Sequence, residues 1–242
     1  MTVKDAAFGA LVAAFPNTGF MGVPLLVALL GPAAAGPVIC SMLADLFVTS
    51  SLCIALAQAS TGHGAAEEGQ AARAAVARAL RGALSNPLPW AIALGALFSV
   101  AGFSLPGPVQ AVVRMLGDAA TPVALFTIGA VLWRASQHAH GRPHVRTHKR
   151  DYVPVALIKL FVHPLLVLLL ALAARSLGAP LSSFQLTVLT LAAALPSASN
   201  VSLLAERYGA DNGRVARIIM TSTVLAFATF PLLAWLFGVQ PV

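Results

Sequence analysis

Residues 14–26 read Ala-Phe-Pro-Asn-Thr-Gly-Phe-Met-Gly-Val-Pro-Leu-Leu and lie inside an apolar segment long enough to cross a membrane. The segment is interrupted by two prolines, Pro16 and Pro24, and by the polar pair Asn17 and Thr18. In lipid every backbone N–H and C=O needs a partner, so a helix breaks only beside protein or a water-filled cavity. The stretch therefore predicts either a broken helix at a binding site near the bilayer midplane or an ordinary Pro-kinked span.

The composition indicates an integral membrane protein. Of the 242 residues, 58% are hydrophobic and 10% are charged, whereas soluble domains carry about 25% charged residues. The formal net charge of +7 does not indicate nucleic-acid binding, because the basic residues lie between apolar segments, where they set orientation. The first five residues lack the pattern of a removable signal peptide.

Seven apolar segments predict an all-α integral membrane protein with about seven transmembrane helices, since each span needs about 20 apolar residues. The expected spans are residues 6–30, 38–57, 86–103, 116–133, 152–174, 184–204 and 215–237. We expect a tight turn at 31–37, an interfacial amphipathic helix at 71–84, a connector at 106–114 and a soluble loop at 134–150. Thr121-Pro122 is expected to interrupt the fourth span.

The distribution of Lys and Arg predicts the orientation. If compartments alternate from the N-terminus, Arg114 and Arg175 fall on one side of the membrane. The other side collects twelve basic residues: Lys4, Arg73, Arg78, Arg81, Arg134, Arg142, Arg146, Lys149, Arg150, Arg207, Arg214 and Arg217. The positive-inside rule makes this crowded side cytoplasmic. We therefore predict a multi-pass protein of the inner (plasma) membrane, with the N-terminus of this chain cytoplasmic and its C-terminus external.

The sixth expected span repeats the pattern of the first. Ala193-Ala194-Leu195-Pro196 matches residues 13–16, and polar residues follow each proline. A Leu-Leu pair and a closing glycine, Gly31 or Gly209, come after both. Because the two spans run in opposite directions, they are predicted to be the paired discontinuous helices of an inverted repeat, which cross at the substrate site.

Residues 16–26 resemble the crossover helix of the auxin efflux carrier family, which includes plant auxin exporters and bacterial malonate-type transporters. Further matches, in the family's order, are Asn86-Pro87, Ala-Leu-Phe-Thr-Ile-Gly at 124–129, Lys159 followed by Pro164, and residues 193–196 with Tyr208-Gly209. The resemblance implies ten helices in two inverted repeats, as in the bile-acid/sodium-symporter-like fold, with broken helices four and nine crossing. It also implies a transport domain that moves against a scaffold domain in an elevator-like way.

On that resemblance the seven spans correspond to helices four to ten, and the chain is expected to lack the first three, through truncation or a misplaced start. Residues 1–58 are then the end of the first repeat, with the crossover helix and the following helix. Residues 59–85 are a cytoplasmic linker with the amphipathic helix. Residues 86–242 are the second repeat of five helices, with its crossover near residue 196.

The expected substrate is a small organic anion such as malonate or an auxin-like carboxylate. Two half-helix N-termini offer free N–H groups and positive dipole ends that suit a carboxylate. The expected substrate-binding residues flank the two breaks: Pro16, Asn17, Thr18, Gly19, Pro196, Ser197, Ser199 and Asn200. The alternative for these polar side chains is hydrogen bonding between helices.

Charged residues inside spans are costly, so Asp45 and Lys159 are functional candidates. They either pair with each other, or Asp45 carries a coupling proton; the structural alternatives are a packing ion pair and a Lys159 that snorkels to the interface. His163 is a candidate proton carrier, with simple packing as its alternative. The coupling ion, proton or sodium, stays open, as does a homodimer.

No catalytic or cofactor motif is expected. His138, His140, His144 and His148 have spacings that a metal could use, but a solvated basic loop is the preferred interpretation, so no metal site is predicted. The sequence contains no phosphate loop or dinucleotide fingerprint. We therefore expect a secondary transporter rather than an enzyme, with a seven-helix receptor or a transport-incompetent fragment as the alternatives.

Overall fold

The computed structural model describes residues 2–59, 87–140 and 148–239, and within these ranges the secondary structure is helical apart from one isolated antiparallel bridge. The first part contains α1 (Val3–Ala14), η1 (Thr18–Gly22), α2 (Val23–Leu30), η2 (Pro32–Ala34), α3 (Ala35–Ala44), η3 (Asp45–Thr49) and α4 (Ser50–Ala59). The second part contains α6 (Pro87–Ala101) and α7 (Gly107–His140). The third contains α8 (Lys149–Leu157), η4 (Ile158–Val162), α9 (His163–Ser176), α10 (Ser183–Ala193), α11 (Asn200–Arg207) and α12 (Asn212–Leu236). The segments η1, η3 and η4 are π-helical turns.

Three continuous helical rods in the described ranges are long and apolar enough to cross a membrane: Pro32–Ala57, Lys149–Ser176 and Asn212–Leu236. Two of them pass through a π-turn, η3 or η4, without ending. Two shorter apolar helices, Thr18–Leu30 and Ser183–Ala193, belong to the two broken spans. The chain is thus an all-α membrane protein, and the second, fifth and seventh expected spans form unbroken helices.

The turn after the first broken span is shorter than expected. Gly31 has a φ of 82°, a left-handed conformation that glycine adopts without a steric penalty, and it ends α2. Gly36 and Pro37, however, lie inside α3 rather than in a turn. Proline is tolerated there because it falls in the first turn of the helix, where backbone N–H groups have no intrahelical partner.

The expected boundaries around α7 are wrong. This helix runs unbroken from Gly107 to His140, so it includes the expected connector, the expected interruption at Pro122 and the start of the expected loop. Pro108 stands in the first turn, where a missing N–H costs nothing, and the Gln110 N–H already reaches the Pro106 carbonyl at 2.9 Å. Pro122 removes one hydrogen bond, but spanning helices tolerate this loss. The expected amphipathic helix at 71–84 lies outside the described residues.

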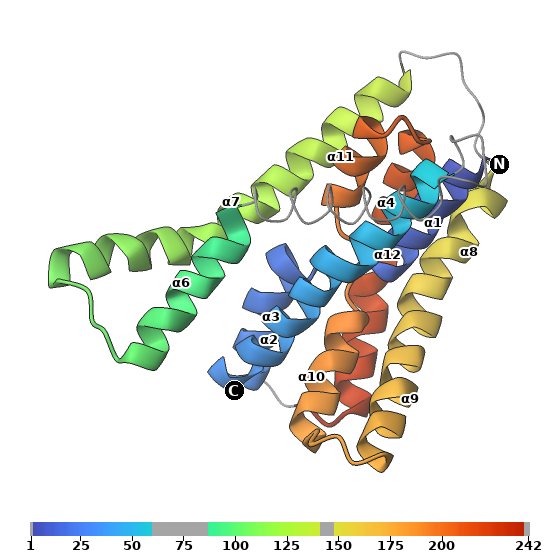
Figure 1. Ribbon diagram of the computed structural model, residues 1–242. Helices are drawn as coiled ribbons and strands as arrows, with labels where there is room; N and C mark the ends of the chain where they lie inside the picture. The colour runs from blue at the N-terminus through green and yellow to red at the C-terminus, as the bar shows by residue number, and fades with distance from the viewer. Residues whose placement is uncertain (1, 60–86, 141–147, 240–242) are drawn as a thin grey trace, which may run out of the picture.

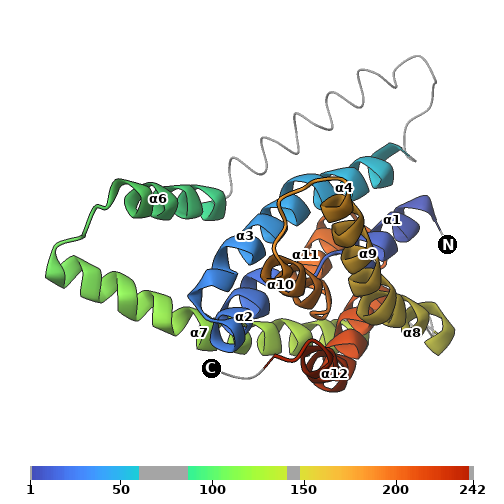
Figure 2. The same ribbon diagram turned by 90° about the horizontal axis from the view of Figure 1, so that it is seen from below.

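Helix α6 and the first half of α7 form an arm that stands away from the other helices (Figures 1 and 2). The remainder of α7 runs past η1 and α12, which it contacts. Large apolar side chains are exposed along the arm, among them Trp90, Leu97, Val100 and Met115. An apolar outer surface of this kind suits a hydrocarbon environment, where apolar side chains need no cover.

Two apolar clusters fill the rest of the molecule, one on each side of the breaks. The first joins α1, α4, α11 and α12, with Phe8, Leu11, Val201 and Ile218 among its most buried members. The second joins α2, α3, α10 and the end of α12 around Leu191. Phe15 and Ala198 belong to the first cluster, whereas Ala194 and Leu195 belong to the second. The two breaks therefore lie between two separate cores.

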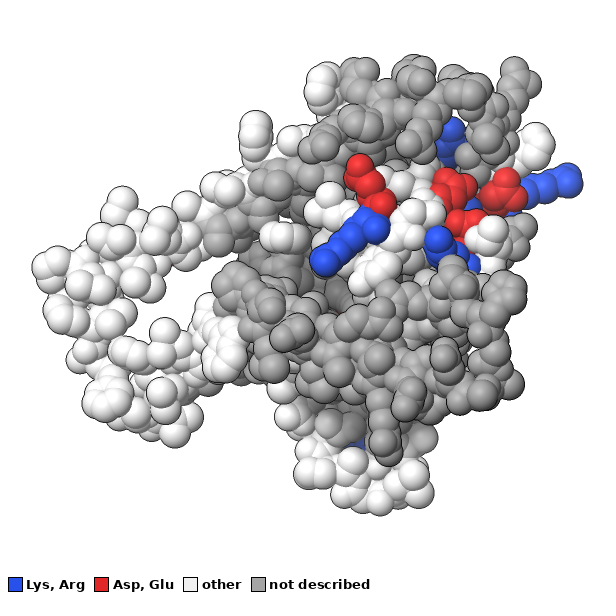
Figure 3. Space-filling view, turned by 45° about the horizontal axis from the view of Figure 1, so that its top comes forward, with Lys and Arg blue, Asp and Glu red and all other residues white. Residues whose placement is uncertain are grey.

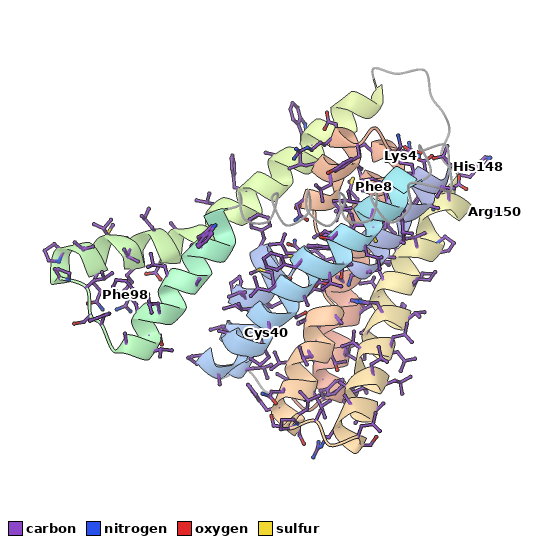
Figure 4. All side chains as sticks on the ribbon, viewed as in Figure 1. Lys4, Phe8, Cys40, Phe98, His148 and Arg150 are labelled. Carbon is purple, nitrogen blue, oxygen red and sulfur yellow. The ribbon has the colours of Figure 1, made fainter. Side chains whose placement is uncertain are left out.

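In the face seen in Figure 3, acidic and basic side chains cluster at one end of the bundle. Lys4, His148 and Arg150 lie there together (Figure 4). The Asp211 N–H donates to Asp5 Oδ1 at 2.9 Å, and Arg214 Nε donates to the Asp151 carbonyl at 2.9 Å. These bonds join the N-terminal ends of α1, α8 and α12. The structure thus brings together residues that the orientation argument assigns to one side of the membrane.

Candidate functional site: the crossing of two broken helices

The first break is caused by Pro16. Proline disfavours a helical conformation in the preceding residue, and Phe15 is extended, with φ −94° and ψ 102°. Its N–H still closes the last turn of α1 on the Leu11 carbonyl at 2.9 Å. The chain resumes as helix at Thr18 through a π-turn, in which the Asn17 carbonyl accepts from Met21 N at 3.1 Å and Gly22 N at 3.0 Å. The sequence prediction of a broken first span is confirmed.

The second break follows the same physics at Pro196. Helix α10 ends at Ala193, and the chain is irregular until α11 starts at Asn200. Helix α11 closes on Gly209, whose φ is 66°, just as α2 closes on Gly31. The predicted repeat of break, half-helix and closing glycine is therefore present in both spans.

The two broken segments pair with each other through their main chains. Asn17 N donates to the Pro196 carbonyl at 2.9 Å, and Ala198 N donates to the Phe15 carbonyl at 3.0 Å. These bonds form the isolated antiparallel bridge between Pro16 and Ser197. Backbone groups freed by the breaks are thereby satisfied inside the protein, which is the condition for irregular backbone at membrane depth.

Ser197 holds the crossing together. Its hydroxyl donates to the Val12 carbonyl at 2.7 Å, and its N–H donates to Ser222 Oγ on α12 at 3.2 Å. Ser222 donates in turn to the Ile219 carbonyl at 3.0 Å. Ser197 therefore fits the helix-to-helix bonding alternative of the sequence analysis. Ser222 was missed; the Thr-Ser-Thr run at 221–223 in an apolar span was the available signal.

Four other polar side chains lie at the breaks, and in the part of the chain that the structure describes none of them makes a side-chain bond like that of Ser197. Asn17 and Ser199, 4% and 7% exposed, make no capping hydrogen bond. Thr18 Oγ1 and Asn200 Oδ1 are buried atoms without a hydrogen-bond partner. Buried polar groups are nearly always bonded, so each unsatisfied group needs an explanation. The two pairs occupy matching places, Asn17-Thr18 after the first break and Ser199-Asn200 after the second.

Two glycines let neighbouring helices approach the first break. A Cβ atom on Gly22 would lie 2.7 Å from Leu195 Cδ1, beside the second break. A Cβ atom on Gly19 would lie 3.3 Å from Met42 Sδ of α3. Gly19 itself is exposed. Small residues at such contacts allow the close backbone approach that membrane helices use for packing.

Lys159 belongs to the η4 turn, and its side chain lies against the C-terminal end of α10. The residue is fully buried, with 0% of its surface exposed. Its Nζ donates to the Ala193 carbonyl at 2.9 Å and lies 2.8 Å from His163 Nδ1. His163 Nδ1 is also 3.1 Å from the same carbonyl oxygen. The snorkelling alternative for Lys159 is wrong, because a buried ammonium caps a half-helix C-terminus, whose dipole is negative.

Asp45 is half-buried in the η3 turn, where Thr49 Oγ1 donates to its Oδ1 at 3.1 Å. Asp45 and Lys159 interact electrostatically, but no salt bridge joins them in the described part of the chain. Both residues lie in π-turns, and π-turns inside helices are frequently found at functional sites. Asp45 and Lys159 are therefore close enough for their charges to interact, but they do not form an ion pair.

Among the residues that the structure describes, no group of three or more His, Cys, Asp or Glu is placed to hold a metal ion. His138 and His140 lie at the end of α7, and His148 precedes α8 as its N-cap. His144 lies outside the described residues.

The fold and the site define an all-α membrane protein in which two broken helices cross between two apolar cores. The family model described as "Membrane transport protein" matches residues 1–235. The chain belongs to this family, which confirms the resemblance to auxin efflux carriers. Its family is one of transporters rather than enzymes.

Named relatives agree with this assignment. The chain is similar to a "Putative malonate transporter" of Rhizobium meliloti (strain 1021), 28% identical over 231 residues, covering 94% of this chain and 66% of the relative. It is 27% identical over 225 residues to an "Uncharacterized transporter" of Methanothermobacter thermautotrophicus, with 92% and 65% covered. It is 25% identical over 237 residues to "Uncharacterized transporter YfdV" of Escherichia coli (strain K12), with 98% and 69% covered. The chain thus spans about two thirds of the length of these relatives.

Proposed function

We propose that this protein is a secondary transporter of small organic anions with a carboxylate, such as malonate or auxin-like acids, and that the crossing is its substrate site. The observation that carries the proposal is the pairing of Pro16 with Ser197, beside which two buried side-chain atoms of the described residues, Thr18 Oγ1 and Asn200 Oδ1, have no hydrogen-bond partner. The neighbouring side chains of Asn17 and Ser199 make no capping bond. The naming of one relative as a malonate transporter supports the choice of substrate class.

The roles of the site residues follow from their positions. Asn17 and Asn200 supply amide donors, and Thr18 and Ser199 supply hydroxyls. Helices Thr18–Leu30 and α11 both begin at the breaks, so their positive dipole ends favour an anion there. Pro16, Gly19 and Pro196 shape the backbone, and Ser197 fastens it.

Transport then proceeds by alternating access in an inner membrane, with residues 1–58 and 86–242 as parts of two inverted repeats around the linker 59–85. The main-chain bridge moves the two half-helices as one unit in an elevator-like step. Asp45, Lys159 and His163 are the groups available for coupling to a proton or another cation. The charged end that holds Lys4, Lys149 and Arg214 is assigned to the cytoplasm.

The test is uptake by proteoliposomes that contain the protein expressed from its complete gene. Radiolabelled malonate is supplied first, followed by other carboxylates, and initial rates are measured against concentration. We expect saturable uptake that falls at least about tenfold in Asn17→Ala and Asn200→Ala, because each removes polar contacts to a charged ligand. Gln110→Ala, which removes an exposed amide on α7, is the matched control and should transport normally.

Unchanged uptake in both asparagine variants would place the substrate elsewhere. Saturable binding of a carboxylate without any flux would instead favour the receptor alternative, because a receptor recognises its ligand without releasing it on the opposite side.

A further inference from the structure

Lys159, His163 and the Ala193 carbonyl form a closed triangle of short contacts. Lys159 Nζ lies 2.9 Å from the carbonyl oxygen and 2.8 Å from His163 Nδ1, and His163 Nδ1 lies 3.1 Å from the same oxygen. The carbonyl oxygen only accepts hydrogen bonds, whereas an imidazole nitrogen either donates or accepts, depending on whether it carries a proton. The triangle therefore restricts where the protons of the pair can be.

Two arrangements of protons give both side chains of the triangle a partner. In the first, the Lys159 ammonium donates to the carbonyl and to His163 Nδ1, so the neutral imidazole carries its proton on Nε2. In the second, Lys159 is a neutral amine that donates to the carbonyl and accepts from the Nδ1–H group of a neutral imidazole. An ammonium beside an imidazolium is strongly disfavoured, because two charged donors would face each other across 2.8 Å. The two arrangements differ by one proton and by the tautomer of His163.

The environment of Lys159 both opposes and favours its charge. The side chain is 0% exposed, and a buried ammonium loses the hydration that stabilises it in water. The charge is favoured by Asp45, with which Lys159 interacts electrostatically, and by the negative end of the α10 dipole. Opposing contributions of this kind are what a group needs if it is to gain and lose a proton in one cycle.

Other titratable side chains on the helices packed against η4 stand near the ends of those helices. The η4 turn contacts α1, α8, α9 and α12, and α10, which supplies the carbonyl, contains no titratable residue in Ser183–Ala193. The titratable residues of the four contacting helices, apart from His163, are Lys4, Asp5, Lys149, Arg150, Asp151, Tyr152, Arg175, Arg214 and Arg217. Asp151 is eight positions before Lys159, about 12 Å along the helix. Lys159, His163 and Asp45 therefore form one charge cluster.

Resting on the proposed function, we propose that Lys159 carries the coupling proton of the transport cycle and that His163 passes this proton to and from Lys159. The carbonyl of the triangle takes no proton, so His163 is the contacting group that delivers one. An incoming proton bonds to the lone pair of His163 Nε2 while Lys159 is a neutral amine. The Nδ1–H bond then breaks, and that proton forms a new N–H bond on Lys159 Nζ. His163 is left neutral with its proton on Nε2, and release follows the same steps in reverse.

The charge that the pair gains lies beside the second break. Ala193 is the last residue of α10 and stands three positions before Pro196. A proton on Lys159 adds positive charge next to this irregular segment, so an anionic substrate at the crossing binds more tightly to the protonated form. Each substrate is then accompanied by one proton that moves in the same direction.

The tautomer of His163 tests the relay without any transport assay. The protein expressed from its complete gene is purified with nitrogen-15 in its histidine rings, and the His163 signals are assigned by their loss in His163→Gln. Between about pH 5 and pH 10, the range in which His and Lys ordinarily titrate, we expect a change from the Nε2–H to the Nδ1–H tautomer. In Lys159→Arg, whose guanidinium stays charged, His163 should keep the Nε2–H form throughout. Lys149→Arg, at the exposed start of α8, is the matched control and should behave like the wild type.

One unchanged tautomer in the folded wild type across this range would overturn the relay. A tautomer change that persists in Lys159→Arg would overturn it as well, because the change would then not report the proton on Lys159. A doubly protonated ring as the main form within the range would contradict the single shared proton. Melting temperatures measured on the same samples show which variants are folded.

Uptake of radiolabelled malonate tests the coupling role. Proteoliposomes are prepared at pH 8 inside and pH 7 outside, with the membrane potential held near zero by potassium and valinomycin. One proton per substrate supports accumulation of up to about tenfold for one pH unit. Lys159→Arg should exchange malonate but bring it only to equal concentrations, because its charge is fixed.

The His163→Gln variant separates the relay from the hydrogen bond. A glutamine amide can donate to or accept from Lys159 Nζ, but it does not pass a proton on. We expect malonate accumulation at least about tenfold slower than in the wild type, the contribution of one positioned proton-transfer group. His148→Gln, at an exposed position before α8, is the matched control and should keep the wild-type rate.

Wild-type accumulation in Lys159→Arg would overturn the role of Lys159 as proton carrier, and a wild-type rate in His163→Gln would overturn the role of His163. Absence of saturable malonate uptake in the wild type would count against the proposed function and the coupling role together. The His163 tautomers would in that case still decide whether the pair exchanges a single proton.

Discussion

The Nζ atom of Lys159 lies 2.9 Å from the carbonyl oxygen of Ala193, the last residue of α10, across 34 positions of sequence. The last carbonyls of a helix have no intrahelical partner and carry the negative end of its dipole. The broken helix thus ends on a buried cation instead of on water. This contact ties the η4 turn to the second break.

Removal of this cap should destabilise the protein. Lys159→Ala takes away the ammonium and leaves a cavity at a fully buried position. We expect a loss of about 2 kcal/mol or more, seen as a melting temperature lower by about 5 °C in detergent. Lys149→Ala, at the exposed start of α8, is the control. Equal melting temperatures for the two variants would contradict the capping role.

The close contact beside the first break should be sensitive to one methyl group. Gly22→Ala places a Cβ atom 2.7 Å from Leu195 Cδ1, in a side chain that is 1% exposed. Such overpacking costs about 1–3 kcal/mol, measured by thermal unfolding. Leu195→Ala should partly rescue Gly22→Ala, because it removes the atom in conflict. In Gly36→Ala, where nothing lies within 4 Å, stability should be unchanged or slightly higher.

Alanine variants of Ser197 and Asn17 should differ in whether they lower the stability of the protein or its uptake activity. Ser197→Ala removes the hydroxyl that satisfies the Val12 carbonyl and should lower stability by about 1–3 kcal/mol. Asn17→Ala removes an amide without a capping bond, so its melting temperature should stay near that of the wild type while uptake falls. Both quantities are measured on the same purified samples. A large stability loss in Asn17→Ala with normal uptake would reverse the assignment.

Asp5 should make the charged end sensitive to acid. Partial burial raises the pKa of Asp5, but hydrogen bonds from Thr2 and the Asp211 N–H, together with the Arg214 charge, outweigh it, so the pKa lies below its ordinary value of 3.8. A carboxyl group whose pKa is lower in the folded state than in the unfolded state stabilises the fold at pH values above its unfolded-state pKa. This stabilisation is lost as the pH falls through the folded-state pKa. Asp5→Asn should therefore melt slightly below the wild type at pH 7, and the difference should shrink below about pH 3.8.

The control for the acid series is Asp118→Asn, which changes an exposed carboxylate on α7. Its melting temperature should follow that of the wild type at both pH values. A gap between Asp5→Asn and the wild type that grows on acidification would contradict the interpretation.

The breaks and their pairing were predictable from sequence because proline acts locally. Proline disfavours a helical conformation in the residue before it, and both Pro16 and Pro196 lie at the breaks. The opposite direction of the two spans follows from counting segments. The continuity of α7 through Pro122 was not predictable in the same way. Whether a proline breaks a helix or only bends it depends on what can satisfy the freed carbonyl, which is a tertiary property.

The sequence also could not show which polar side chains at the breaks are hydrogen-bonded to other helices and which are not. Ser197 and Ser199 are equivalent in local sequence, yet one bonds to Val12 and the other makes no capping bond. The difference comes from α1 and α12, which are far away in the chain. The burial of Lys159 could likewise not be predicted from its position near the start of a span. It depends on the contact with the Ala193 carbonyl, 34 positions further along the chain.

The bond from Ser197 to the Val12 carbonyl spans 185 positions, which has a consequence for biogenesis. During synthesis the first broken helix leaves the ribosome long before its partner exists. The Val12 and Phe15 carbonyls, which accept hydrogen bonds from Ser197 and Ala198, must bind water or the insertion machinery until the second break has been synthesised. The crossing therefore forms late in synthesis. A chain that ends before residue 197 lacks the hydroxyl that donates to the Val12 carbonyl, so the hydrogen bonding of its first span is incomplete.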